Sequence, residues 1–222
     1  MKHTILSGLL FISLGTTGQI KKESILLGGD LNFSSGSFKS DNVPNSYPSN
    51  NSGFGISPVA GFAVKENLIV GIGLSYGTNI QKQEQPNSLR KLTSNSYGGN
   101  IFIRKYYLLS SSFFLFVNSS LGVNEWKQKS TYDAPANNTE QKTLSVAGNI
   151  FPGIAFKIKK NFFLEASLNN LLSISYSQNN ATQTDVAGNQ YGTTGKQFSF
   201  SSSIGNGSNP LSIGAKWIIA KK

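Results

Sequence analysis

The chain contains no cysteine, and its single histidine is His3. The absence of cysteine excludes disulfide frameworks, thiolate metal sites and thiol catalysis. No apolar run approaches the roughly 18 to 20 residues that a transmembrane helix needs. Charged residues make up only 14% of the 222 residues, against 38% hydrophobic residues and 23 glycines. This composition predicts one folded domain and excludes both a disordered chain and a helical membrane protein.

Residues 1–18 have the pattern of a secretion signal. Basic Lys2 is followed by an apolar stretch and then by small residues that end at Gly18. The alternative is a short first strand or a buried helix. We predict a signal peptide over residues 1–18 and an outer-membrane β-barrel domain over residues 19–222. That domain would contain no histidine, so the usual general base and the commonest metal ligand are missing. We therefore predict a protein that is not an enzyme, with no catalytic residues, no metal site and no cofactor.

Beyond residue 18 the hydrophobic residues alternate with a period of two, which is the signature of strands with two different faces. The clearest pair runs from Phe54 to Val64 and from Leu68 to Tyr76, with a tight turn between them. No segment has a convincing helical period. The alternation predicts eight strands, which include residues 27–33, 54–64, 68–76, 97–103, 113–123, 144–158, 162–176 and 211–219.

The predicted connections alternate between short and long. Short turns fall at residues 65–67, 109–112 and 159–161. Long polar loops fall at residues 34–53, 77–96, 124–142 and 177–209. Short turns at one end and long loops at the other are typical of barrels in the outer membrane. The predicted fold is all-β, an eight-stranded antiparallel up-and-down transmembrane β-barrel with short periplasmic turns and long extracellular loops.

Two prolines lie inside predicted strands. The segment around Pro58 recurs around Pro152 in an internal repeat, which supports the hairpin pattern. Proline cannot donate a hydrogen bond to a strand ladder. We therefore predict a β-bulge or a missing ladder bond at each position.

The two faces of the predicted strands decide between a membrane barrel and a soluble one. One face carries mostly Gly, Ser, Ala and Asn, which suits the crowded interior of an eight-stranded barrel. Bulky residues such as Phe62, Leu74 and Ile154 would then face lipid. A soluble lipocalin-like barrel would instead expose many Lys and Glu side chains. Aromatic residues near strand ends are predicted to form girdles at the membrane interfaces, namely Tyr76, Tyr97, Tyr107, Trp126, Tyr176 and Trp217.

Three segments resemble a known family. They are residues 150–156 with the turn at residues 159–161, residues 102–107, and residues 211–217. They are similar to the small outer-membrane β-barrel (porin-like, OmpX/OmpW-like) domain of Gram-negative bacteria. The resemblance implies an outer-membrane location, with outer-membrane lipids and the outer-membrane assembly machinery as partners. The family usually ends on an aromatic residue, whereas this sequence ends on Ala220, Lys221 and Lys222.

The residues that produce the net charge of +10 are unevenly distributed over the predicted strands and turns. One group of charges is predicted to point into the lumen and to form a network there: Asp30, Arg104, Lys157, Glu165 and Lys216. A second group is predicted to form a basic rim at the periplasmic edge: Lys65, Lys159, Lys160, Lys221 and Lys222. A basic chain can bind nucleic acid, but here the aromatic residues are committed to lipid. We therefore predict no nucleic-acid partner.

The predicted function is that of an integral outer-membrane β-barrel protein with a structural or surface-interaction role. Its extracellular partner would meet the loops at residues 34–53, 77–96, 124–142 and 177–209. One alternative is a narrow passive channel, porin-like, for ions or small solutes, which requires a continuous water path through the lumen. A second alternative is a soluble periplasmic ligand carrier.

Overall fold

The computed structural model describes residues 19–38, 48–85, 88–132, 138–168, 171–202 and 211–220. The predicted signal peptide at residues 1–18 lies outside these ranges. Within them no helix is long and apolar enough to cross a membrane. The regular elements in these ranges are strands: β1 (Ile25–Phe38), β2 (Ser49–Lys65), β3 (Leu68–Gln85), β4 (Ser88–Leu108), β5 (Phe113–Tyr132), β6 (Asn138–Lys159), β7 (Phe162–Leu168), β8 (Leu172–Thr184), β9 (Gln190–Ser202) and β10 (Leu211–Ile219).

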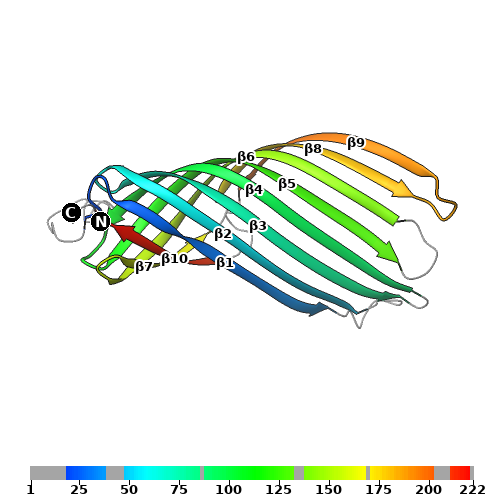
Figure 1. Ribbon diagram of the computed structural model, residues 1–222, viewed down its shortest axis with the longest axis horizontal. Helices are drawn as coiled ribbons and strands as arrows, with labels where there is room; N and C mark the ends of the chain where they lie inside the picture. The colour runs from blue at the N-terminus through cyan, green and yellow to red at the C-terminus, as the bar shows by residue number, and fades with distance from the viewer. Residues whose placement is uncertain are drawn as a thin grey trace, which may run out of the picture.

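Eight of these strands form a closed antiparallel ring (Figure 1). Strands β1 to β7 follow one another in chain order around the ring, and β10 closes it between β7 and β1. Neighbours in the ring are antiparallel, so the barrel is of the up-and-down type. The predicted fold class is confirmed at this level.

The last two strands of the barrel are each divided into two segments. β7 and β8 follow one another along β6, and β10 and β9 follow one another outside them. β6 pairs with β7 as far as Gly153↔Ser167 and with β8 from Ile150↔Leu172, and the register shifts between the two ladders. The prediction of one continuous strand over residues 162–176 was therefore wrong. β9 was also missed, because its residues were placed in the loop at 177–209. It forms a hairpin with β8, from Leu172↔Ser202 to Thr184↔Gln190.

The strands extend much further than the hydrophobic pattern indicated. The β3–β4 ladder continues to Gln85↔Ser88, and the β5–β6 ladder continues to Ser130↔Thr139. Most of the described residues in the predicted loops 34–53, 77–96, 124–142 and 177–209 are therefore strand, and those loop boundaries were wrong. In these upper parts both strand faces are mainly polar, so the apolar alternation disappears although the backbone ladder continues.

The large apolar side chains lie on the outside of the barrel. Phe62, Leu74 and Ile154 are 45%, 63% and 53% exposed, so the predicted orientation of the two faces is the one observed. The outward residues of β4 from Tyr97 to Tyr107 span about 33 Å at about 3.3 Å per residue. A tilt of about 40° reduces this to about 25 Å, the height of the apolar band on outer-membrane barrels.

Aromatic pairs lie on the outer surface toward both ends of this band. The rings of Tyr76 and Tyr97 are 5.3 Å apart, and those of Phe162 and Trp217 are 4.8 Å apart. Trp126 was wrongly assigned to the girdles. On β5 the residues buried inside are Phe114, Phe116 and Asn118, and Trp126 has the same parity, so its side chain faces the lumen.

Aromatic side chains fill the barrel at the end with the short turns. We call this filling the floor, and its buried members are Leu26, Ile69, Phe102, Tyr106, Phe114, Phe116, Phe163 and Ile218. Glycines at the register-partner positions on neighbouring strands make room for the rings. A Cβ on Gly71 would lie 2.5 Å from the ring of Phe102, and a Cβ on Gly153 would overlap the ring of Phe116. The predicted interior of small residues therefore holds only above the floor.

Both prolines interrupt a ladder, as predicted. The β2–β3 ladder skips Pro58 between Ile56↔Tyr76 and Val59↔Gly73. Pro152 pairs with Val117 of β5, and on its other side it lies where β6 leaves β7 and meets β8. Proline has no N–H to donate, and each of the two prolines thus lies where one of its two neighbouring strands offers no ladder partner.

Candidate functional site

A buried ion pair lies within the floor. Arg104 of β4 places its Nη1 2.7 Å from Oε2 of Glu165 on β7, and the two side chains are 6% and 4% exposed. The Tyr106 hydroxyl donates to Oε1 of Glu165 at 2.7 Å. Arg104 Nε donates to Oδ1 of Asn118 at 3.0 Å, and the guanidinium lies 4.5 Å from the Phe116 ring centroid. Both carboxylate oxygens therefore have a donor, which is the condition for burying such a pair.

A second ion pair lies beside the first. Lys216 of β10 is fully buried, and its Nζ donates to Oδ1 of Asp30 on β1 at 3.0 Å. Gly28 leaves room for the lysine stem, because a Cβ there would lie 2.6 Å from the Lys216 side chain. Gly214 likewise accommodates the Asp30 carboxylate. The pair joins the two strands that close the barrel.

The structure brings four of the five predicted lumen charges into these two pairs and leaves Lys157 out. Lys157 is half-buried near the turn between β6 and β7. The Glu165 carboxylate that was predicted beside it is bound by Arg104 and Tyr106. Tyr106 and Asn118 were missed as members of the network. Tyr106 has the same parity as Arg104 on its strand, and that parity was the available signal.

The basic rim lies at the end of the barrel with the short turns. Lys65, Lys159 and Lys160 are exposed in or beside these turns, and the exposed side chains of Lys21 and Lys22 lie at the same end, just before β1. Lys221 and Lys222 lie outside the described residues. The described ends of the chain also lie at this end (Figure 1). Positive charge is thus concentrated on one edge of the molecule.

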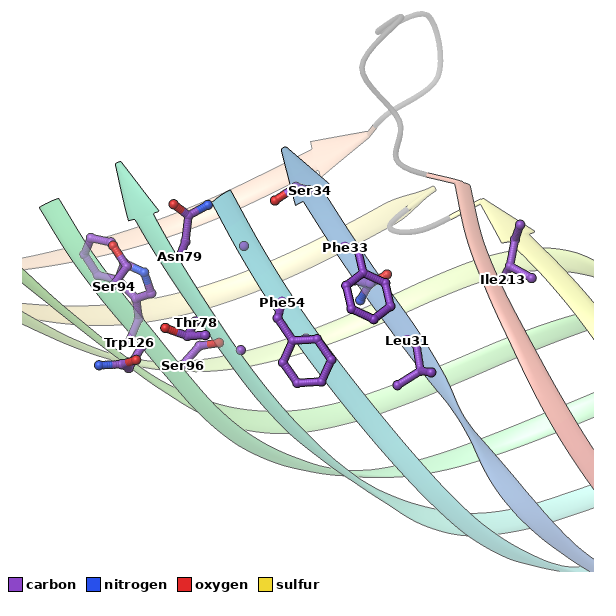
Figure 2. Close-up of a pocket in the computed structure, with 15 residues that line it drawn as sticks. Leu31, Phe33, Ser34, Phe54, Thr78, Asn79, Ser94, Ser96, Trp126 and Ile213 are labelled. Carbon is purple, nitrogen blue, oxygen red and sulfur yellow. The ribbon is translucent and has the colours of Figure 1, made fainter. Parts of the chain in front are cut away.

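A cavity of about 510 Å³ lies above the floor. Hydroxyl and amide side chains together with one indole line its inner side, among them Asn32. Figure 2 labels Ser34, Asn79, Ser94, Ser96 and Trp126 from the same lining. These residues come from β1, β3, β4 and β5. Within the described ranges, no three acidic or histidine side chains come together as a metal-ligand set.

The cavity reaches the outer surface at a break in the wall. The β1–β10 ladder ends at Asp30↔Gly214. Beyond it, among the described residues, β1 pairs with β2 alone and β9 pairs with β8 alone. We call this break the seam. Leu31, Phe33 and Ile213 have exposed side chains at the seam and line the same cavity (Figure 2). The outward-facing Phe54, Thr78 and Asn95 of β2, β3 and β4 also line it. The cavity therefore has a polar inner side and an outer side that is largely apolar.

Comparisons with known proteins add little to this geometry. No family model matches the chain, and no curated protein matches its sequence. Among solved structures, the chain is similar to the ferric yersiniabactin uptake receptor FyuA from Yersinia pestis, with 12% sequence identity and a TM-score of 0.40. The match covers 73% of this chain and 26% of the receptor, so the chain spans about a quarter of that protein's length.

Proposed function

We propose that the chain is an integral outer-membrane β-barrel protein with a structural or surface-interaction role. The observation that carries this proposal is the continuous outer belt of exposed large apolar residues, which includes Ile72, Leu74, Ile101 and Leu121. Soluble monomers rarely expose contiguous apolar patches larger than a few hundred Å². A belt of this height, with tyrosine and tryptophan toward its edges, suits a bilayer and argues against the soluble carrier.

The first test is whether the barrel inserts into lipid. Purified protein folded into vesicles should stay with them after carbonate washing, and it should run differently on a denaturing gel before and after boiling. Protein that stays dispersed without detergent, and whose gel mobility boiling does not change, would contradict the proposal.

The floor supports a structural role over the channel. Phe102, Phe114, Phe116 and Phe163 are buried across the lumen, and the Arg104–Glu165 pair lies among them. A passive channel needs a continuous water path, and the buried rings at this level argue against one. Planar-bilayer recording of folded protein should therefore show no reproducible single-channel steps. Regular steps from folded protein would favour the porin-like channel instead.

We also propose that the basic rim contacts anionic lipid headgroups of the inner leaflet. The exposed positions of Lys65, Lys159 and Lys160 support this proposal, since juxtamembrane basic residues contribute about 1 kcal/mol each near an anionic surface. Changing Lys159, Lys160, Lys221 and Lys222 to Gln should reduce binding to phosphatidylglycerol vesicles more than to phosphatidylcholine vesicles. Unchanged binding to both would contradict the rim's role.

Recognition by the outer-membrane assembly machinery, membership of the OmpX/OmpW-like family, and an extracellular partner remain parts of the same proposal. The partner would meet the end opposite the rim, at the connections between β1 and β2, β3 and β4, β5 and β6, and β8 and β9. Crosslinking from the β8–β9 turn, which includes Asp185 and Asn189, would capture such a partner on intact cells. Crosslinks from the rim end alone would contradict this orientation.

A further inference from the structure

Directly above the floor, the lumen is lined by polar side chains that carry no formal charge. Higher up, Arg90 of β4 also faces inward, and its Nε donates to Oγ of Ser130 at 3.3 Å. The strand registers define one row of inward-facing positions that runs from β1 around to β9: Asn32, Gly55, Gly77, Ser96, Trp126, Thr143, Asn179 and Gly195. The next row comprises Ser34, Gly53, Asn79, Ser94, Gln128, Gln141, Ala181 and Thr193. Two adjacent rows of the interior thus present mainly hydroxyl groups, amide groups and glycine, with a single aromatic side chain.

Several of these polar groups are available to a ligand. No side-chain hydrogen bond within the described part of the chain involves Asn32, Asn79 or Ser96. Amide and hydroxyl groups both donate and accept hydrogen bonds, so they match a ligand that also does both. An apolar ligand would leave them without partners, which costs free energy. An ionic ligand at this level would find no counter-charge beside it, because the charges of the floor are already paired with each other and Arg90 lies four residues beyond Ser94 on β4.

Trp126 adds a flat apolar surface to this polar lining. Its indole faces the lumen and lines the 510 Å³ cavity together with Ser94 and Ser96 (Figure 2). A sugar ring has apolar C–H faces and a rim of hydroxyl groups, so it can stack on an indole while its edge binds amides. The cavity volume lies within the range of about 300–1,000 Å³ that is usual for small-ligand sites.

We propose that this cavity binds a neutral, hydroxyl-rich ligand, namely a short uncharged oligosaccharide. Trp126 provides the stacking surface, and Asn32, Asn79 and Ser96 provide the hydrogen bonds. The floor beneath the cavity makes it a binding site rather than a passage. The sugar enters from the open end as a free oligosaccharide, or through the seam as the headgroup of a glycolipid whose chain lies against Leu31 and Phe33.

The two tryptophans of the chain allow a direct test. Trp217 lies on the outer surface, so the Trp217→Phe variant leaves Trp126 as the only tryptophan reporter. We would fold this variant into phosphocholine micelles, which carry no sugar, and titrate maltotriose while recording tryptophan fluorescence. We expect a saturable change with a dissociation constant in the millimolar range or below. In the second arm, dodecyl maltoside replaces maltotriose. Tighter binding of dodecyl maltoside indicates entry through the seam, and equal or weaker binding indicates the free sugar.

Two further variants locate the site. Ser96→Phe adds a ring inside the cavity and should weaken maltotriose binding at least tenfold. Val123→Phe adds the same bulk on the outer face of β5 and should leave binding unchanged. Boiling-dependent gel mobility verifies that each variant is folded, so loss of the barrel is distinguished from loss of the site. The proposal is overturned if folded protein shows no saturable change with either sugar. It is also overturned if Ser96→Phe binds as the parent does, or if a sulfated trisaccharide binds as tightly as maltotriose.

Discussion

The buried pair of Arg104 and Glu165 offers the sharpest test of how the floor is held together. In the Glu165→Leu variant the guanidinium keeps its buried position but loses the carboxylate 2.7 Å away. The Tyr106 hydroxyl also loses its acceptor. Breaking a buried ion pair by removing one partner costs about 3–5 kcal/mol, because a charge stays buried without compensation. We expect the free energy of unfolding to fall by that amount.

A double-mutant cycle separates the ion pair from simple packing. The Arg104→Met variant removes the other partner and should cost about as much as Glu165→Leu. The double variant replaces the pair with apolar side chains, a change that is often neutral or stabilising. We therefore expect the double variant to be more stable than either single variant, with a coupling free energy of several kcal/mol. Urea-induced unfolding of the barrel in lipid, followed by tryptophan fluorescence, measures these differences.

The matched control is an exposed ion pair on the outer surface. Glu125 lies 2.7 Å from Lys142 and 3.0 Å from Lys127, and all three side chains are more exposed than the floor pair. Exposed pairs contribute between about 0 and 1 kcal/mol, so Glu125→Leu should have little effect. If Glu165→Leu proved equally mild, water would have to reach Arg104. The floor would then be wet, and the main support for a non-conducting barrel would be lost.

Three further predictions concern the outer belt, the packing of the floor and the upper turn. Ile72→Arg should destabilise the barrel in lipid by about 2–4 kcal/mol or block insertion, because Ile72 faces outward within the apolar band. Gly153→Ala should destabilise it by about 1–3 kcal/mol, because its Cβ would overlap the ring packed against it. Hydrogen bonds from Asn189 hold the pKa of the Asp185 carboxyl below its ordinary value. NMR titration should therefore show a higher pKa for Asp185 in the Asn189→Ala variant than in the parent. In the parent, the contact between Asp185 and Asn189 is lost as the pH falls through the lowered pKa.

Two controls make the first two of these predictions specific. Asn95→Arg places the same charge on the outer face of the neighbouring strand β4, above Tyr97, where it should be tolerated in lipid. Gly99→Ala introduces a Cβ whose nearest neighbours are 3.7 Å away, so it should cost little. Equal destabilisation by Ile72→Arg and Asn95→Arg would show that the band has been placed at the wrong height.

The lower half of the barrel could be predicted from the sequence, because its outer face has to be apolar. The alternation of apolar and small residues from Phe54 to Val64 is a direct result of that requirement. Such alternation predicts the eight strands that form the ring. β9 could not be found in this way. Only Phe198 and Phe200 carry a bulky apolar signal on its outer face at the end near β10. The rest of the strand is held by backbone hydrogen bonds to β8, and those leave no pattern in the side chains.

The floor was missed for a different reason, since its signal was present in the sequence. Phe113 to Phe116 is apolar on both faces, and a short continuous apolar run indicates burial on both sides of a strand. Phe113 and Leu115 point outward, whereas Phe114 and Phe116 are buried. We predicted the interior from the average composition of the inward-facing residues, and an average does not reveal a local cluster of aromatic side chains.

Strand phase also decides the position of Trp126. Its place near a strand end favoured the girdle, but side chains alternate strictly, and the buried Phe114 and Phe116 assign every even-numbered residue of β5 to the interior. The same phase places Asn118 in the ion-pair network and brings Trp126 beside its register partner Ser96. The even-numbered residues of β5 thus line both the floor and the cavity above it. An aromatic residue can be assigned to lipid or lumen only after the phase of its strand is known.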